Sequence, residues 1–329
     1  MVTATPPVRW GLMGTARINR HLVPAMRAAS RSVITAVASR ARPRADAHAR
    51  EWDIAHAVEG YDTLLARDDV DAVYVPLPNS LHAEWTLRAI EAGKHVLCEK
   101  PLVTDPADVD QIREAAEAAG VVVEEGFMYR HEPLTDRVVA LVSSGGIGEV
   151  CGVVSGFTYA RNRAHDVRLS PDLGGGALLD VGCYPISYAC LLFGSDCQTA
   201  TGSVHLSPEG VDEECAGTLR FAGGRVATIY AGFRAAYRTW LDVLGSEGSL
   251  TVPNPFKPGA CEALVLDRLG ERRLIEVRGS QALFVRQVEH FVGSVLDGRP
   301  VTVTLGESRR VARALQALAT AARREGEPT

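Results

Sequence analysis

The first 125 or so residues alternate between short apolar runs and longer segments in which apolar residues recur every three or four positions. Short apolar runs are typical of buried strands, and the longer spacing is typical of helices with one covered face. The expected strands lie at 8–13, 33–38, 57–58, 72–77, 96–98 and 121–123, and the expected helices at 17–29, 43–52, 62–67, 82–91 and 106–119. This alternation predicts a parallel sheet covered by helices on both faces.

In the remainder of the chain, strand-like segments follow one another across short Gly-containing turns, which predicts β-hairpins. The expected strands lie at 150–159, 198–206, 215–221, 225–232, 239–244, 249–252, 262–269 and 273–277, and the expected helices at 177–193, 284–296 and 307–324. We therefore predict an α/β protein of two domains. A parallel-sheet domain spans 1–126, and an α+β domain with an open-faced, mostly antiparallel sheet spans 127–329.

Composition narrows the classes of partner. The chain has 329 residues, 46% hydrophobic and 23% charged, with a net charge of −5, which gives no electrostatic footprint for nucleic acid or an anionic membrane. No segment approaches the ~20 uninterrupted apolar residues of a membrane span, and the N-terminus lacks the features of a secretory signal. The seven cysteines form no CxxC pair and no zinc spacing with histidines. We expect a cytoplasmic protein with reduced cysteines, no metal site, and no nucleic-acid or membrane partner.

A turn joins the first expected strand to the first expected helix. Of the glycines in the dinucleotide-binding pattern GxGxxG only Gly14 is present, and Ala16 and Asn19 replace the other two. The turn still offers backbone N–H groups at a helix start, which favour a pyrophosphate. The residues expected to bind a dinucleotide here are Gly14, Thr15, Ala16, Arg17 and Ile18.

Ser39 and Arg40 stand at the end of the second expected strand, where an NAD-binding protein usually has Asp or Glu for the ribose 2′-hydroxyl. Arg42 and Arg44 follow, and no acidic residue lies before Ala45. A hydroxyl and a guanidinium suit a 2′-phosphate, which a carboxylate would repel. A basic, solvated helix start is the alternative reading. The pattern favours NADP(H) over NAD(H).

Lys100 lies in Cys98-Glu99-Lys100-Pro101, directly after a short apolar run. The carboxyl end of a strand in a dinucleotide-binding sheet is where hydride chemistry occurs, and an ammonium there can bind a substrate oxygen. The alternative is a solvated lysine at a strand end. The other motifs favour the first reading.

Five short motifs occur in order along almost the whole chain. They are 14–18, Pro78-Asn79-Ser80-Leu81-His82, Glu99-Lys100-Pro101, Gly126-Phe127-Met128-Tyr129-Arg130 and the Gly-Gly-Ala-Leu-Leu-Asp-Val-Gly-Cys-Tyr run at 175–184. Together they resemble the Gfo/Idh/MocA oxidoreductases. The resemblance implies a Rossmann domain followed by an open-faced sheet domain that binds substrate and often dimerises through the sheet, so we expect a homodimer or homotetramer.

The resemblance also assigns site residues. It implies a cis Lys100–Pro101 bond, which proline permits at low cost. The further cofactor contacts that it implies are Leu77, Asn79, His82, Glu99, Lys100 and Arg130, the catalytic residues are Lys100, Asp180 and Tyr184, and the substrate contacts are Lys100, Tyr129, Arg163, Asp180 and Tyr184.

Asp180 and Tyr184 are four positions apart, so on a helix they share a face, which we expect to look towards Lys100. The Tyr184 phenol can donate a proton if a cation such as Lys100 stabilises the phenolate. Many members of the family have histidine at this position, so the sequence leaves open whether Tyr184 or Lys100 is the donor. Pro185 predicts a kink immediately afterwards.

The irregular segment 161–174 contains Arg161, Arg163 and Arg168, which are candidates for binding a diphosphate. A solvated loop is an equal alternative. The adjacent His165 and Asp166 resemble a catalytic pair but match no family motif, so we interpret them as at most a substrate contact.

Taken together, the sequence predicts an NADPH-dependent ketoreductase acting on a sugar ring, with a dTDP-linked 3-keto-6-deoxyhexose as the favoured substrate. Tyr184 resembles the branch of the family that contains sugar 3-ketoreductases. The alternatives are an NADP-dependent dehydrogenase of a free aldose, an inositol or a trans-dihydrodiol, and a dinucleotide-binding regulator without catalysis. Retention of Lys100, Asp180 and Tyr184 argues against the regulator.

Overall fold

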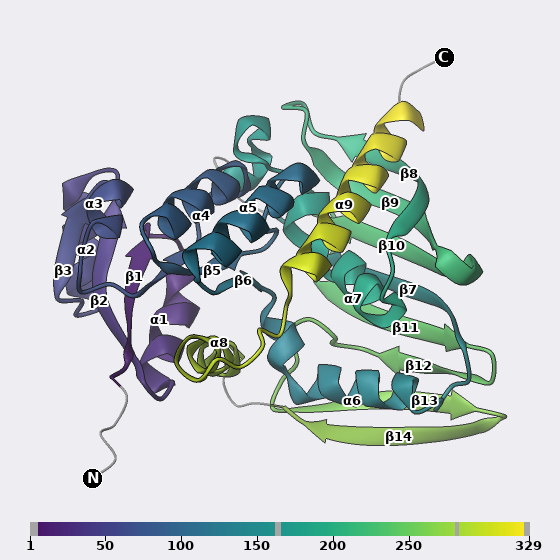
Figure 1. Cartoon of the computed structure of the whole chain (residues 1–329). Coiled ribbons are helices and arrows are strands. Elements are labelled where there is room, and N and C mark those ends of the chain that lie inside the picture. The colour runs from purple at the N-terminus through teal and green to yellow at the C-terminus, as the bar shows by residue number, and fades with distance from the viewer. Residues whose placement is uncertain (1–5, 162–165, 280–282, 326–329) are drawn as a thin grey trace, which may run out of the picture. The chain divides into compact units, whose positions relative to one another are not determined.

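The computed structural model describes residues 6–161, 166–279 and 283–325, which form two compact units (Figure 1). Unit 1 contains the described residues of Met1–Val103, Ala107–Met128 and Ala282–Leu305. Unit 2 contains those of Thr104–Pro106, Tyr129–Gln281 and Gly306–Thr329. Unit 1 holds a six-stranded sheet and unit 2 an eight-stranded sheet, which confirms the predicted fold class.

Unit 1 has the strand order β3-β2-β1-β4-β5-β6, and all neighbouring strands are parallel. The strands are β1 (Val8–Met13), β2 (Ser32–Ser39), β3 (His56–Glu59), β4 (Ala72–Val75), β5 (His95–Glu99) and β6 (Val123–Gly126). The helices between them are α1 (Asn19–Ala28), α2 (Arg42–Glu51), α3 (Tyr61–Leu65), α4 (His82–Glu91) and α5 (Pro106–Ala119). The strand order reverses between β1 and β4, so a ligand site is expected at their carboxyl ends.

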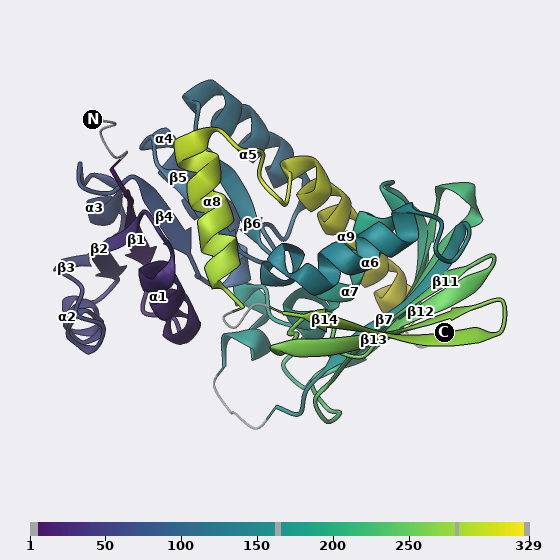
Figure 2. The ribbon, with the colours of Figure 1, turned by 90° about the horizontal axis from the view of Figure 1, so that it is seen from below.

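Helix α8 (Val285–Asp297) packs in unit 1 against α1 and β1 (Figure 2). Phe291 lies in the buried core beside Trp10, with ring centroids 5.2 Å apart, and Arg31 pairs with Asp297 at 2.7 Å. Right-handed crossovers that run in opposite directions lie on opposite faces, so α4 and α5 leave part of the α1 face for α8 to cover. The predicted division at 126/127 differs from the structure here, because this helix belongs with unit 1.

Unit 2 has the strand order β14-β13-β12-β11-β7-β10-β9-β8. The strands are β7 (Val150–Thr158), β8 (Cys197–Leu206), β9 (Asp212–Phe221), β10 (Val226–Gly232), β11 (Arg238–Gly245), β12 (Gly248–Val252), β13 (Cys261–Arg268) and β14 (Glu271–Arg278). Only β7 and β10 pair in parallel among the described strands of this sheet, because the chain returns from β7 to β10 through a long crossover.

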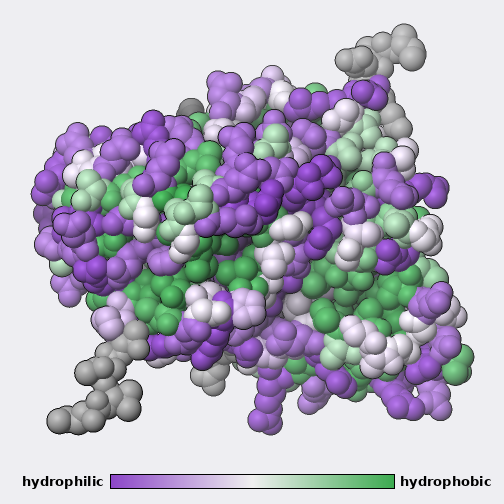
Figure 3. Space-filling view, viewed as in Figure 1, coloured by the Kyte–Doolittle hydropathy of each residue, from purple (hydrophilic) through white to green (hydrophobic). Residues whose placement is uncertain are grey.

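Helices α6 (Pro133–Ser143), α7 (Cys183–Phe193) and α9 (Leu305–Glu325) lie on one face of the unit 2 sheet (Figures 1 and 2). Helix α9 is amphipathic. Its exposed positions include Arg313, Gln316, Thr320 and Arg323, and hydrophilic residues predominate along it in Figure 3. The predicted open-faced sheet with helices on one side is therefore confirmed for this unit.

A π-helical turn, Leu178–Gly182, leads directly into α7. Pro185 has no N–H to continue the regular helical ladder, so a wider turn just before it is the local response to the kink that the sequence predicts. The segment Pro171–Phe193 is long and apolar enough to cross a membrane, but 83% of its apolar 18-residue window is buried inside the protein. Its apolar character is therefore that of a core helix.

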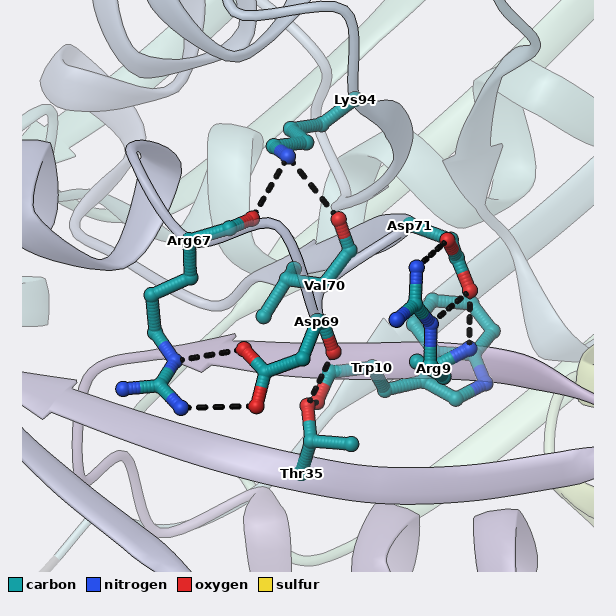
Figure 4. Close-up of polar contacts among 8 residues, drawn as sticks. All are labelled: Arg9, Trp10, Thr35, Arg67, Asp69, Val70, Asp71 and Lys94. Carbon is teal, nitrogen blue, oxygen red and sulfur yellow. Dashed lines mark hydrogen bonds and ion pairs between the residues drawn. The ribbon is translucent and has the colours of Figure 1, made fainter.

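At the amino edge of the unit 1 sheet, side chains hold the segment that precedes β4 (Figure 4). Asp71 accepts the backbone N–H of Arg9 at 2.9 Å and its guanidinium at 2.6 and 2.9 Å. Lys94 donates to the carbonyl oxygens of Arg67 and Val70, each at 2.9 Å. These bonds satisfy backbone groups that the sheet leaves unpaired at its edge. This edge is structural, and the chemistry must be sought at the carboxyl edge.

We expect Asp71→Asn to lower the free energy of unfolding by about 1–2 kcal/mol, because it removes the charge that accepts three hydrogen bonds from Arg9. Burial raises the pKa of Asp71, but the hydrogen bonds from Arg9 outweigh burial and hold the pKa below its ordinary value. The stabilisation is therefore present at neutral pH and is lost as the pH falls through that lowered pKa.

Urea unfolding of both proteins, at neutral pH and in acid, measures this effect, and the difference between them should shrink in acid. Asp267→Asn is the control, because it breaks an ion pair with Arg272 that is exposed to solvent and should change unfolding little. Equal effects of the two variants would contradict the structural role of Asp71.

Candidate active site

The turn after β1 retains the shape that a dinucleotide needs. Gly14 has φ +114°, a conformation that glycine adopts without strain. Asn19 is fully buried, donates through Nδ2 to the Gly14 carbonyl oxygen at 3.0 Å, and lies 3.0 Å from His48 Nε2. Burial lowers the pKa of His48, so the neutral ring can accept from Asn19. The asparagine that replaces a motif glycine thus braces the turn, a role that the sequence analysis missed.

The end of β2 brings the predicted specificity residues to the same edge of the sheet. Ser39 is buried, and its hydroxyl accepts from the Ala41 N–H at 3.4 Å, while Arg40 is exposed. A hydroxyl and an exposed guanidinium at this position fit a 2′-phosphate. Leu77 also belongs here, because its Cδ2 lies 3.4 Å from where a side chain on Gly14 would begin.

Tyr61 is a further residue of this edge that the sequence analysis did not select. It follows β3, meets Trp85 edge to face at 5.0 Å, and its hydroxyl lies 3.7 Å from where a Gly14 side chain would begin. Burial raises the pKa of Tyr61, and the charges of Arg40 and Arg44 oppose that rise. The Tyr61 hydroxyl therefore lies close to the turn at Gly14, and the charges of Arg40 and Arg44 act on it. The position directly after a third strand was the only signal in the sequence.

The residues on both sides of Lys100 are held by side chains from other elements of unit 1. The Tyr74 hydroxyl of β4 donates to Glu99 Oε1 at 2.6 Å, and the Leu102 N–H donates to Glu125 Oε1 of β6 at 2.9 Å. The Lys100–Pro101 bond is cis, as the family resemblance predicts. The backbone at Lys100 is thus fixed at the carboxyl end of β5.

His82 contributes to the same arrangement from the start of α4. Its side chain is fully buried, with Nδ1 2.7 Å from the Pro101 carbonyl oxygen and Nε2 2.8 Å from that of Leu77. Burial lowers the pKa of His82, and the two carbonyl oxygens oppose that shift. The neutral ring carries one N–H, so it donates to one of the two carbonyl oxygens and lies between the segments that follow β4 and β5. A direct contact of His82 with the cofactor stays a prediction, and the observed contacts are with the backbone around Lys100.

In unit 2, Asp180 lies in the π-helical turn and is held by two partners. Its Oδ2 accepts from the Tyr159 hydroxyl at 2.7 Å and pairs with Arg168 Nε at 2.9 Å. The charge of Asp180 raises the pKa of Arg168 above its ordinary value. Asp166 pairs with Arg168 at 3.3 Å and with Arg161 at 3.5 Å.

Of the arginines in segment 161–174, Arg161 and Arg168 thus pair with a carboxylate of the same segment. Arg163 and His165, which the sequence analysis considered as substrate contacts, lie outside the described residues. Arg168 connects this segment to Asp180.

Tyr184 begins α7 within an aromatic cluster of unit 2. Its ring lies 5.5 Å from Phe157, 5.4 Å from Phe256 and 6.1 Å from Tyr129. Tyr129 is fully buried, donates its hydroxyl to Ser187 at 2.9 Å, and burial raises its pKa well above the ordinary value. Tyr129 thus packs against the ring of Tyr184. The predicted contact of Tyr129 with substrate stays a prediction.

Arg130 also lies in unit 2, buried and paired with Glu307 of α9 at 3.0 Å. Its predicted contact with the cofactor stays a prediction. Within the described parts of the chain, no three His, Cys, Asp or Glu side chains gather as metal ligands.

Two family profiles match the chain. One, described as an oxidoreductase family with an NAD-binding Rossmann fold, covers residues 8–127, and the other, described as the GFO/IDH/MocA C-terminal domain, covers residues 135–251. The dTDP-3,4-didehydro-2,6-dideoxy-alpha-D-glucose 3-reductase of Streptomyces violaceoruber is 43% identical over 79% of this chain and 76% of that protein. The D-xylose 1-dehydrogenase (NADP(+)) 2 of Haloferax volcanii is 36% identical over 94% of this chain and 95% of that protein.

A similar solved structure is that of a 3-ketoreductase from Actinomadura kijaniata in complex with NADP and TDP-benzene. It has a TM-score of 0.89 and 35% sequence identity, and the match covers 96% of this chain and 98% of that one. The similarity thus extends through both units, as the order of the five motifs predicts. The chain is an oxidoreductase and belongs to the Gfo/Idh/MocA family.

Proposed function

We propose that this oxidoreductase is an NADPH-dependent ketoreductase that reduces a ketone on a dTDP-linked 3-keto-6-deoxyhexose. The observation that carries the proposal is the fixed position of Lys100, whose neighbours Glu99, Pro101 and Leu102 are each held by another element at the carboxyl edge of a dinucleotide-binding sheet. The similarity to the Streptomyces 3-reductase and the Actinomadura 3-ketoreductase supports the substrate class.

The residues at this edge fit NADP(H). The turn at Gly14 offers backbone N–H groups to the pyrophosphate, and Ser39 with Arg40 suits the 2′-phosphate. When bound, the nicotinamide supplies a hydride to the carbonyl carbon. The Lys100 ammonium stabilises the negative charge that develops on the carbonyl oxygen.

The proton for the new hydroxyl comes from Tyr184 or Lys100. The phenol of Tyr184 is a stronger acid when a cation stabilises its phenolate, so we propose that the two residues act on the same oxygen. Within unit 2, Asp180 holds Arg168 and Tyr159, and a guanidinium at this position can meet a diphosphate.

The second candidate is oxidation of a free aldose by NADP. It is supported by the similarity to the Haloferax D-xylose dehydrogenase, which spans nearly the whole chain. We also propose a cytoplasmic homo-oligomer. All seven cysteines are free thiols, and the exposed apolar side chains of Val154 and Leu244 lie on the unit 2 sheet.

Loss of NADPH absorbance with a panel of ketones tests the function. We expect rapid oxidation with a dTDP-linked 3-keto-6-deoxyhexose, and slow or no oxidation with free ketoses, keto-inositols or no sugar, because the diphosphate supplies binding energy that free sugars lack. If no ketone in the panel caused NADPH oxidation and D-xylose reduced NADP⁺, the second candidate would replace the proposal.

Lys100→Ala should lower kcat by about a hundredfold or more while the NADPH Kd changes little, because one charge at the reacting oxygen is lost. Tyr184→Phe then identifies the proton donor: a comparable loss assigns the proton to Tyr184, and a loss below about tenfold assigns it to Lys100. Lys94→Ala is the matched control at the opposite edge of the same sheet, and should lower stability without lowering kcat. Turnover of Lys100→Ala at the wild-type rate would remove Lys100 from the reaction.

His82→Leu should lower kcat about tenfold with little change in the NADPH Kd, because the ring that contacts the Pro101 and Leu77 carbonyl oxygens is lost and Lys100 shifts. His82→Gln retains a side-chain donor and should recover part of the rate. His205, exposed on β8, gives the control His205→Leu. A weaker NADPH Kd with unchanged kcat at saturation would instead support the direct cofactor contact that the sequence analysis expects.

A further inference from the structure

Asp212, the first residue of β9, lies against the start of the helical segment that carries Asp180 and Tyr184. Its Oδ2 accepts the Leu178 N–H at 2.6 Å, and its carboxylate also interacts with the Ala177 N–H. The first N–H groups of a helix have no partner within the helix, and a carboxylate satisfies both their hydrogen bonds and the helix dipole. Asp212 thus caps this segment from a neighbouring strand.

The backbone is shaped to admit that carboxylate. Gly176 has φ +114°, and a Cβ added there would overlap the Asp212 carboxylate. The glycine before the helix is therefore needed for the cap as well as for the turn.

The other end of the same helix is held by a charge of opposite sign. Arg225, which directly precedes β10, donates Nη1 to the Phe193 carbonyl oxygen at 2.8 Å, Nη2 to Ser195 Oγ at 3.2 Å and Nε to the Ala222 carbonyl oxygen at 2.8 Å. A cation at a helix C-terminus is favourable for the same reason that a carboxylate is favourable at the N-terminus. The helical segment from Leu178 to Phe193, which comprises the π-helical turn and α7, is therefore held at both ends by residues that adjoin one sheet.

We propose that Asp212 is a positioning residue for the reaction: its carboxylate fixes the first turn of this helix, and through that turn the positions of Asp180 and Tyr184. The proposal rests on the proposed function, because that function assigns the chemistry to Asp180 and Tyr184, and Asp212 acts through the backbone that carries them. Arg225 acts at the far end of α7 and stabilises the helix without setting the catalytic turn.

The ionisation of Asp212 gives this role a pH dependence. Burial raises the pKa of Asp212 to about 6, while the N–H groups of Leu178 and Ala177 and the charge of Arg323 on α9 restrain the rise. Cys215 lies on the same strand as Asp212, and burial, with the charge of Asp212, raises the pKa of Cys215 to about 12, so it stays neutral. The cap is therefore complete above about pH 6 and weakens below it.

As the pH rises and Asp212 ionises, its contribution to the free energy of unfolding should fall while kcat rises. A carboxyl with a raised pKa contributes most to the free energy of unfolding below its unfolded pKa, and loses that contribution as the pH rises through about 6. The catalytic turn, in contrast, is ordered by the ionised form. A purely structural residue would not produce opposed trends.

Asp212→Asn, which keeps the shape but does not ionise, tests the proposal. We expect kcat at pH 7.5 to fall about tenfold with an unchanged NADPH Kd, and the acid limb of the wild-type kcat profile near pH 6 to be absent in the variant. Arg225→Gln is the matched control, and should lower Tm while leaving kcat and its pH profile within about twofold. An acid limb that persists in Asp212→Asn, or an unchanged kcat, would overturn the proposal.

Amide hydrogen exchange over residues 175–184 separates this proposal from the proposed function, because it needs no substrate. Protection of this segment should fall in Asp212→Asn, and should fall in the wild-type protein between pH 7.5 and pH 5 after correction for the intrinsic rate. If the wild-type enzyme reduces no ketosugar, the proposed function fails while the exchange data still report on the cap. Unchanged protection in both comparisons would show that Asp212 does not hold the helix.

Discussion

The two contacts of His82 with backbone carbonyl oxygens are the constraint on which the proposed chemistry depends. The chain between β5 and α5 is irregular, and irregular backbone keeps one position only where side chains satisfy its polar groups. His82 joins Pro101 to Leu77 at 2.7 and 2.8 Å, and thereby ties the segments that follow β4 and β5 to one another. Glu99 is bonded to Tyr74, and the Pro101 carbonyl oxygen contacts His82. Lys100 lies between these two residues, so the backbone that carries its ammonium is held in place.

In unit 2 the backbone that carries the candidate catalytic residues is helical, and it too is held by other elements. Tyr184 is held by the rings of Phe157 and Phe256, and the turn that carries Asp180 is capped from β9 by Asp212. In each unit, the residues to which we assign the chemistry lie on a stretch of backbone that is held by an element far away in the sequence.

The local pattern of the sequence predicted most of the elements, since the expected strand at 8–13 coincides with β1 and Lys100 directly follows β5. The sixth strand was expected at 121–123 but runs over Val123–Gly126. The prediction missed its second half because Glu124 and Glu125 are buried there, and two glutamates in sequence do not indicate a buried strand. The apolar face of α8 shows that the helix is covered, but not by which sheet, so its place in unit 1 was not predictable. Asp212 and the bridging contacts of His82 depend on partners far along the chain, and many of those partners are backbone groups that no side-chain pattern reveals.

Transfer of deuterium tests the central claim most directly, namely that this chain moves a hydride from NADPH to a ring ketone of a nucleotide-linked sugar. The enzyme would be supplied with a dTDP-linked 3-keto-6-deoxyhexose and NADPH that carries deuterium at the transferred position of nicotinamide C4, and the product analysed by mass spectrometry. The account predicts a reduced sugar nucleotide with one deuterium on the former carbonyl carbon. A reduced product without deuterium, or no product from an enzyme that binds both compounds, would contradict it.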